Sequence, residues 1–319
     1  MFWRSRTTPD PVVEAPPPVL RLGAAGDSAA SRATLAHALL CDGQYAAALA
    51  ELEVALADNP ELSDGQLAKG FALARQLRFH EAVEPLRLAL ESGDQQRLAA
   101  FGLAAVYLRL QDFSSALKLS QQLLAQDDQD AKVHSLQGEI LQSLGRSAEA
   151  LDAFRTAVQL NPQLFVARRR LGELLAAAGQ LDESHRELQS ASYLAPTDAQ
   201  LAQSLAGVLR RLGRHDEAAQ QYQKAMEFGR PTAELLAAIA ECRIDQKRMF
   251  EAYSAVRAAL TINPLFADGH RLLAAIYTQQ GRHDEARLHD AAAAKLSGEA
   301  AVAELPLSPA IVTQAPCAP

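Results

Sequence analysis

Apolar and small residues recur along this chain with a period of 34 positions. Three Asn-Pro pairs reveal the period, because Asn59-Pro60, Asn161-Pro162 and Asn263-Pro264 are separated by 102 residues, three times 34. Self-similarity at a fixed period of this size is the signature of stacked repeats. The period divides the chain into eight blocks without an insertion: 29–62, 63–96, 97–130, 131–164, 165–198, 199–232, 233–266 and 267–300.

Within each block the apolar positions predict two helices. Positions 7, 8 and 11 share one helical face, and positions 20, 24, 27 and 28 share a second, as Ala150, Phe154, Ala157 and Val158 do. Position 8 is Ala or Gly in every block and position 20 is Ala or Ser, which indicates helices that approach too closely for a large side chain. Each block is therefore predicted to be an antiparallel helix pair.

The segment between the two helical faces carries turn signals. Five blocks place a glycine there, which suits the left-handed cap that ends a helix: Gly43, Gly145, Gly179, Gly213 and Gly281. The other three blocks carry Leu77, Gln111 and Lys247 instead, so their hairpins are expected to differ slightly. Prolines such as Pro162 then block continuation of the second helix into the next block.

Residues 136–162, LQGEILQSLGRSAEALDAFRTAVQLNP, closely match a known repeat pattern of Leu-Gly, Tyr, Ala, Phe, Ala and Pro. In these residues, and over 29–300 as a whole, the chain resembles the tetratricopeptide repeat family. The resemblance implies an all-α fold, a right-handed α-solenoid of stacked antiparallel helix hairpins. It also implies a non-enzymatic scaffold or adaptor that binds a peptide segment of a partner in a concave groove. The chain departs from the family pattern at position 4, where His134, Arg168 and His270 replace the common aromatic residue.

The two ends of the chain are of another kind. Residues 1–28 are rich in proline and are expected to be disordered, and residues 301–319 are expected to form a flexible tail that contains proline. No secretory signal and no run of about 18 apolar residues is present, so we expect a cytoplasmic protein without a membrane span.

Composition narrows the classes of function. Of the residues, 49% are hydrophobic but only 5% are aromatic, so Ala and Leu must carry the packing. A net charge of -7 argues against nucleic-acid binding, which needs clustered Lys and Arg. Cys41, Cys242 and Cys317 lie far apart without metal-ligand spacing, so neither a zinc site nor a disulfide framework is expected. The preference for Arg over Lys and the many alanines are typical of a bacterial, GC-rich genome.

Clusters that resemble catalytic or metal sites occupy one repeated position. His80-Glu81, His215-Asp216-Glu217 and His283-Asp284-Glu285 all fall at the start of a second helix. Acidic residues there complement the helix dipole. No P-loop, GxGxxG or HExxH motif occurs. We therefore expect no catalytic residues, no metal and no cofactor.

The family resemblance implies that positions 2, 5, 9, 12 and 13 of each first helix line the groove. The expected groove residues are Leu67, Phe71, Arg75, Leu98, Phe101, Arg109, Lys132, Arg169, Arg210 and Arg211. An apolar partner peptide would lie against Phe71 and Phe101, and its acidic groups would meet Arg109, Arg169 and Arg210. Two alternatives stay open: both phenylalanines pack within the stack, and Arg168 to Arg170 form a solvated helix face.

Other functions also fit a repeat array. One is a subunit that selects substrates in trans for a glycosyltransferase or sulfotransferase, and another is a chaperone for a secretion or surface-polymer assembly. A clamp for the C-terminal carboxylate of heat-shock chaperones is not expected, because position 9 is never Asn. The sequence leaves the partner and the oligomeric state open.

Overall fold

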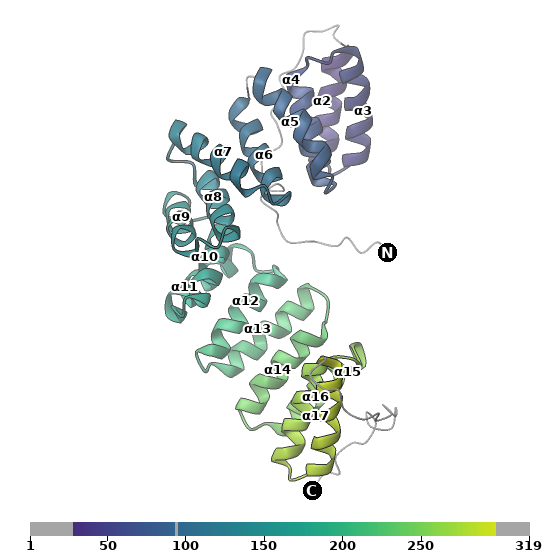
Figure 1. Cartoon of the computed structure of the whole chain (residues 1–319), viewed down its shortest axis with the longest axis vertical. Coiled ribbons are helices and arrows are strands. Elements are labelled where there is room, and N and C mark those ends of the chain that lie inside the picture. Colours follow the sequence, from purple (N-terminus) through teal and green to yellow (C-terminus); the bar gives the residue numbers. More distant parts are fainter. Residues whose placement is uncertain (1–27, 93–94, 298–319) are drawn as a thin grey trace. The chain divides into compact units, whose positions relative to one another are not determined.

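The computed structural model describes residues 28–92 and 95–297, and these residues form 16 helices and no strands (Figure 1). Of residues 1–28, which were expected to be disordered, Ser28 begins the first helix and the others lie outside the described ranges, as does the expected tail 301–319. The helices alternate between a first and a second member of a pair. The first members are α2 (Ser28–Cys41), α4 (Ser63–Arg75), α6 (Gln96–Arg109), α8 (Ala131–Ser143), α10 (Phe165–Ala177), α12 (Ala199–Arg211), α14 (Ala233–Asp245) and α16 (Ala267–Gln279). The second members are α3 (Tyr45–Asp58), α5 (Phe79–Ser92), α7 (Phe113–Gln126), α9 (Ser147–Leu160), α11 (Leu181–Leu194), α13 (His215–Phe228), α15 (Met249–Ile262) and α17 (His283–Ser297).

The chain divides into two compact units, Met1–Leu174 and Leu175–Pro319, with the boundary inside α10. In the first unit each helix from α2 to α8 packs on the next, and the first helices also pack on one another (α2 on α4, α4 on α6, α6 on α8). In the second unit α11 to α17 pack in the same order, and α14 packs on α16. The predicted class, an all-α solenoid of helix hairpins, is therefore confirmed.

Glycines at the eighth position of a repeat show how closely the paired helices approach. A Cβ atom added at Gly70 in α4 would lie 2.5 Å from the side chain of Leu86 in α5. At Gly138 in α8 it would lie 2.9 Å from the ring of Phe154 in α9. These separations are shorter than van der Waals contact, so only a residue without a side chain fits. The predicted reason for small residues at this position is thus correct.

The turns without glycine have the same backbone conformation as the glycine turns. Leu77, Gln111 and Lys247 have φ of 63°, 62° and 61°, in the left-handed region that the five turn glycines also occupy. The hydrogen bonds match too, since the Asp112 N–H donates to the Tyr107 carbonyl at 2.9 Å just as the Arg146 N–H donates to Leu141. The expectation of a different hairpin is therefore wrong. One residue must reverse the chain after each first helix. The backbone of these three residues is therefore held in a conformation that favours glycine.

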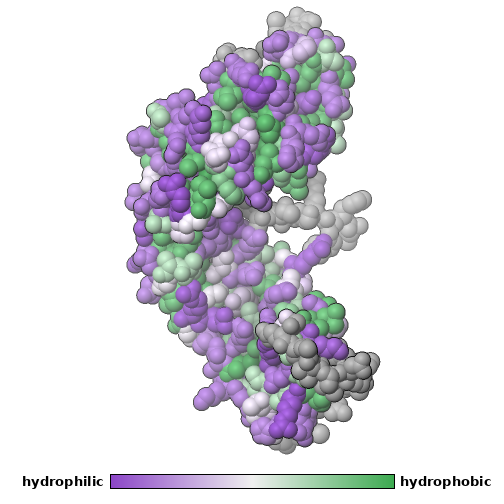
Figure 2. Space-filling view, in the orientation of Figure 1, coloured by the Kyte–Doolittle hydropathy of each residue, from purple (hydrophilic) through white to green (hydrophobic). Residues whose placement is uncertain are grey.

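Each unit has its own apolar core. The core of the first unit extends from Leu49 in α3 to Ile140 in α8. In the second unit one cluster joins α11 to α14 and another joins α14 to α17. On the visible face of each unit polar side chains predominate, and smaller apolar areas are scattered among them (Figure 2). None of the described helices is both long and apolar enough to cross a membrane.

The last helix, α17, has a narrow buried face. Ala286, His289 and Ala293 are buried, whereas Asp290 at the usual aromatic position is exposed. His289 instead lies against His270 of α16, with the two Nδ1 atoms 2.9 Å apart. The histidine at position 4 of this repeat therefore has a packing role that the departure from the family pattern did not suggest.

Candidate functional site

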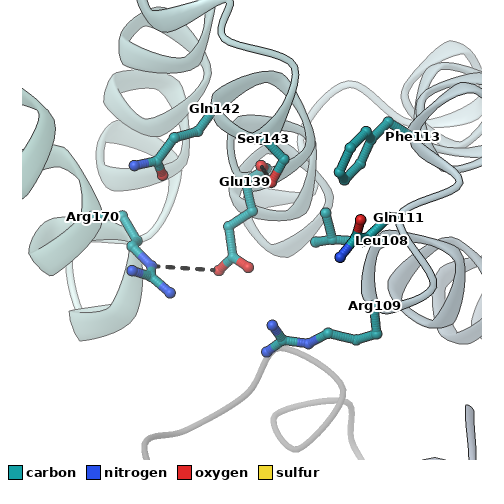
Figure 3. A pocket seen from close by; sticks show the side chains of 8 residues that line it. All are labelled: Leu108, Arg109, Gln111, Phe113, Glu139, Gln142, Ser143 and Arg170. Carbon is teal, nitrogen blue, oxygen red and sulfur yellow. Dashed lines mark hydrogen bonds and ion pairs between the residues drawn. The ribbon is translucent and has the colours of Figure 1, made fainter.

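The first unit contains a pocket of about 460 Å³ (Figure 3). Its walls come from three places: the end of α6 with the following turn and the start of α7, one face of α8, and α10. The lining residues are Leu108, Arg109, Gln111, Phe113, Glu139, Gln142, Ser143 and Arg170. Leu108, Arg109, Glu139, Gln142 and Ser143 occupy repeat positions 12, 13, 9, 12 and 13, which the resemblance assigned to the groove. The pocket therefore lies on the face that was expected to bind a partner.

Helix geometry explains why α8 contributes three residues. Glu139, Gln142 and Ser143 are spaced three and four residues apart, so they share one face of the helix. The Ser143 hydroxyl donates to the Glu139 main-chain carbonyl at 2.9 Å, which orients it along the helix. Leu108 and Phe113 form an apolar wall, because Leu108 belongs to the core and Phe113 packs against it. The pocket thus has apolar and polar sides.

A buried carboxylate stands between two guanidinium groups. Glu139 is only 7% exposed, and its Oε1 lies 3.9 Å from Nε of Arg170. Nη1 of Arg170 also lies 3.2 Å from Oε2 of Glu173. Figure 3 shows Arg170 on one side of Glu139 and Arg109 on another, both extending toward the same space. With two arginines and one glutamate, the lining carries one positive charge in excess.

Arg170 has bonding capacity left for a ligand. Its Nε atom is buried and makes no hydrogen bond to any described residue. A buried donor in this state is unfavourable until an acceptor reaches it. Because Nε itself is buried, a ligand would approach the accessible part of the Arg170 side chain, which is 32% exposed.

Of the ten residues expected in the groove, Arg109 lines the pocket. Arg75 and Leu98 are half-buried and Lys132 is exposed, all on first helices of the first unit but outside the pocket. In the second unit Arg210 is half-buried and pairs with Glu241 (Nη1 to Oε2, 2.6 Å). Arg211 is exposed and donates to the main-chain carbonyl of Ala176.

Leu67, Phe71 and Phe101 are corrected to core residues. Leu67 is 1% exposed, Phe71 is 5% and Phe101 is 9%. The Phe71 ring fills a space that only glycine leaves open, because a Cβ at Gly102 would lie 2.8 Å from it. A partner cannot reach side chains packed this closely, and the alternative that both phenylalanines pack within the stack is the correct one.

Arg169 is also corrected, since it is 1% exposed and cannot meet a partner's acidic group. Its neighbour Arg170 lines the pocket instead. Successive residues on a helix point about 100° apart, so a shift of one position separates a buried arginine from one in the pocket.

The ten expected residues leave out Leu108 and Glu139, which occupy groove positions 12 and 9, and also Gln111, Phe113, Gln142, Ser143 and Arg170 of the pocket. Gln142 and Ser143 could have been found, because they occupy groove positions 12 and 13 of the fourth repeat. Gln111, Phe113 and Arg170 carry no such signal, since they lie outside those positions.

The glutamates of the histidine and acidic clusters at the starts of second helices pair with arginines of the preceding turns. Glu81 and Glu217 each pair with an arginine three residues earlier, Arg78 and Arg214, at 2.6 Å. Hydrogen bonds from these arginines lower the pKa of both carboxyls. Within the described ranges, no group of three or more His, Cys, Asp or Glu side chains is placed to hold a metal ion.

Comparisons with known proteins agree with this architecture. Three models described as tetratricopeptide repeat match residues 101–165, 141–209 and 199–230. No functionally curated protein matches the chain in sequence.

Solved structures of similar fold include a tetratricopeptide repeat protein from Parabacteroides merdae, with 20% identity, coverage of 79% of this chain and 99% of that one, and a TM-score of 0.55. They also include Pseudomonas aeruginosa pilF, with 20% identity, coverage of 67% and 97%, and a TM-score of 0.60. Cut9-Hcn1 of the APC/C is similar at 18% identity, with coverage of 87% and 55% and a TM-score of 0.55. The matches over residues 101–230 and the eight helix pairs of the described residues show that the chain contains tetratricopeptide repeats.

Proposed function

We propose that this protein is a non-enzymatic scaffold that holds a peptide segment of a partner protein, with the pocket around Arg109 and Arg170 as an anchor. The family supports a role in protein–protein interaction. The pocket supports a binding site in the first unit, because the first helices contribute most of its lining and charged and polar side chains point into it. A cytoplasmic location and a bacterial origin rest on composition and belong to the same proposal.

The lining favours a peptide with an acidic side chain next to an apolar one. The excess positive charge of Arg109 and Arg170 attracts a carboxylate, and guanidinium groups bind carboxylates with two parallel hydrogen bonds. Leu108 and Phe113 offer an apolar surface beside it. Arg75, Leu98, Lys132, Arg210 and Arg211 are further candidate contacts outside the pocket. No role for nucleic acid, metal or cofactor is proposed.

A positional-scanning array of synthetic decapeptides tests the proposal. We expect Asp or Glu at one position and an apolar residue beside it to be selected, and replacement of the acid by its amide to abolish the signal. Arg109→Glu should weaken the selected peptides about 10- to 100-fold, the value of a hydrogen bond between charged groups. Arg109 is exposed, so its substitution leaves the core intact, and thermal unfolding of the variant checks that the loss of binding is not a loss of folding.

Lys118→Glu is the control, because it makes the same charge change at an exposed site on the second helix α7 of the same unit. Equal losses for Arg109→Glu and Lys118→Glu would show a general charge effect and would refute the pocket as the anchor.

A further inference from the structure

Gln111 has a strained backbone, and its side chain lines the pocket. Its φ of 62° lies in the left-handed region, where every residue except glycine is disfavoured. Five of the eight turns at this position use glycine. Gln111 lines the pocket, whereas Leu77 and Lys247, which share its conformation, do not. Strain alone therefore does not distinguish Gln111, but strain together with the pocket does.

A side chain at this turn position gives little to folding. A Cβ atom added at Gly145, Gly179, Gly213 or Gly281 meets no other atom within 4 Å. The Gln111 side chain is likewise exposed rather than packed. Within the part of the chain that the structure describes, its carboxamide forms no hydrogen bond. The folded chain thus provides no contact of the Gln111 side chain that would offset the strained backbone, and the carboxamide is available to a ligand in the pocket.

Gln142 presents a second carboxamide to the same space. It is half-buried on α8, and its side chain also lacks a hydrogen bond to any described residue. Figure 3 places Gln142 and Gln111 on different sides of Glu139. Each carboxamide both donates and accepts, which is the complement of a peptide group with its N–H and C=O. Charged groups would instead pair with the two arginines.

We infer that Gln111 and Gln142 bind the main chain of an extended peptide beside its acidic residue, and that Gln111 keeps its unfavourable backbone because of this contact. The inference rests on the proposed function and adds to it the part of the ligand that each group recognises. The arginines bind the acidic side chain of the peptide, and the carboxamides bind the neighbouring peptide groups. Leu108 and Phe113 contact an apolar side chain. Gln111 is thus a residue that determines affinity rather than stability.

The test measures stability and binding on the same variants of the full chain. Gln111→Gly removes both the strain and the carboxamide, so we expect the melting temperature to rise by about 2 °C and the best decapeptide of the array to bind about 5- to 10-fold more weakly. Leu77→Gly is the matched control, because it relieves the same strain in the same unit outside the pocket. It should raise the melting temperature and leave the dissociation constant unchanged.

A scan of N-methylated copies of that decapeptide identifies the contact. N-methylation removes one amide donor at a time, so one or two positions next to the acidic residue should weaken binding to the wild type about 5-fold or more. The same copies should bind Gln111→Gly or Gln142→Met with a smaller loss at one of those positions. This coupling between a ligand amide and a side chain is a result that a structural role would not produce.

The outcomes separate this inference from the proposed function. If Gln111→Gly binds the decapeptide as tightly as the wild type while Arg109→Glu does not, the pocket remains the anchor and the role of Gln111 is refuted. If N-methylation weakens all proteins equally, recognition of the main chain by these carboxamides is refuted as well. If the wild type selects no acidic peptide, both the proposed function and the inference are refuted.

Discussion

The Nδ1 atoms of His270 and His289 lie 2.9 Å apart between α16 and α17, and both rings are buried. Nε2 of His270 lies 3.2 Å from the carbonyl oxygen of Pro264, so this nitrogen donates and carries the hydrogen. Nδ1 of His270 is then the acceptor, and Nδ1 of His289 is the donor. Protonation of His270 at Nδ1 would remove this acceptor, so the hydrogen bond requires a neutral His270.

This pair predicts acid sensitivity of the second unit. Burial, and after it the neighbouring His270, lower the pKa of His289 from 6.5 to about 4. Burial also lowers the pKa of His270, against the hydrogen bond to Pro264. His289 also stacks on the Tyr277 ring, over which the Arg282 guanidinium lies. A group with a lowered pKa stabilises the fold above its unfolded pKa and loses that contribution as the pH falls.

Between pH 6.5 and 4 the unfolding free energy should therefore fall by about 3 kcal/mol through His289. Urea unfolding at several pH values measures it. The double variant His270→Leu/His289→Leu replaces both partners by apolar side chains and should show a shallower fall over this interval. The same slope in both proteins would contradict the prediction.

The left-handed turn residues predict gains in stability. Lys247→Gly should stabilise the second unit by about 0.5–1 kcal/mol, because glycine relieves the left-handed strain and this exceeds its own entropic loss. Gly213→Ala should have the opposite effect of about 1 kcal/mol, and it isolates backbone strain, since the added Cβ meets no atom within 4 Å. Thermal unfolding measures both. A loss of stability in Lys247→Gly would show that the lysine side chain has a folding role.

The contact between Phe71 and Gly102 predicts a coupled pair. Phe71→Ala should cost about 3–5 kcal/mol, as for a buried phenylalanine in a core. Gly102→Ala should cost about 1–3 kcal/mol through overpacking, because its Cβ would lie 2.8 Å from the Phe71 ring. A double-mutant cycle with Phe71→Leu should recover part of the second loss. Additive effects would mean that the ring and Gly102 do not press on one another.

The small residue near the start of each second helix, at repeat position 20, is predicted not to tolerate a larger side chain. Ala150 and Ala218 are fully buried, so Ala150→Leu and Ala218→Leu should each destabilise by about 1–3 kcal/mol. Ala148→Leu is the control on the same helix, since Ala148 is exposed. Chemical denaturation of the three variants decides the matter. Equal stability for Ala150→Leu and Ala148→Leu would refute the assigned repeat register.

The repeat, the helix pairs and the positions where helices touch could all be predicted from the sequence. These features depend on local rules: helix periodicity, small residues at crossings, and turn and stop signals after each helix. The rules apply identically in every repeat, so eight copies reinforce one another. Gly70 and Gly138 could therefore be read as crossing points before their neighbours Leu86 and Phe154 were known.

The side chains that a partner can reach could not be predicted in the same way, because their exposure depends on packing between repeats. The groove positions of the family describe an average repeat. The burial of one side chain depends on the size of the side chains on the helix that packs against it. Phe71 is buried because Gly102 of the following repeat leaves room for its ring, and Arg170 rather than Arg169 reaches the pocket because one step along a helix turns a side chain by about 100°. The position of Gln111 in the pocket, and the pairing of His270 with His289 from the neighbouring helix, depend in the same way on packing between helices, which the pattern within one repeat does not contain.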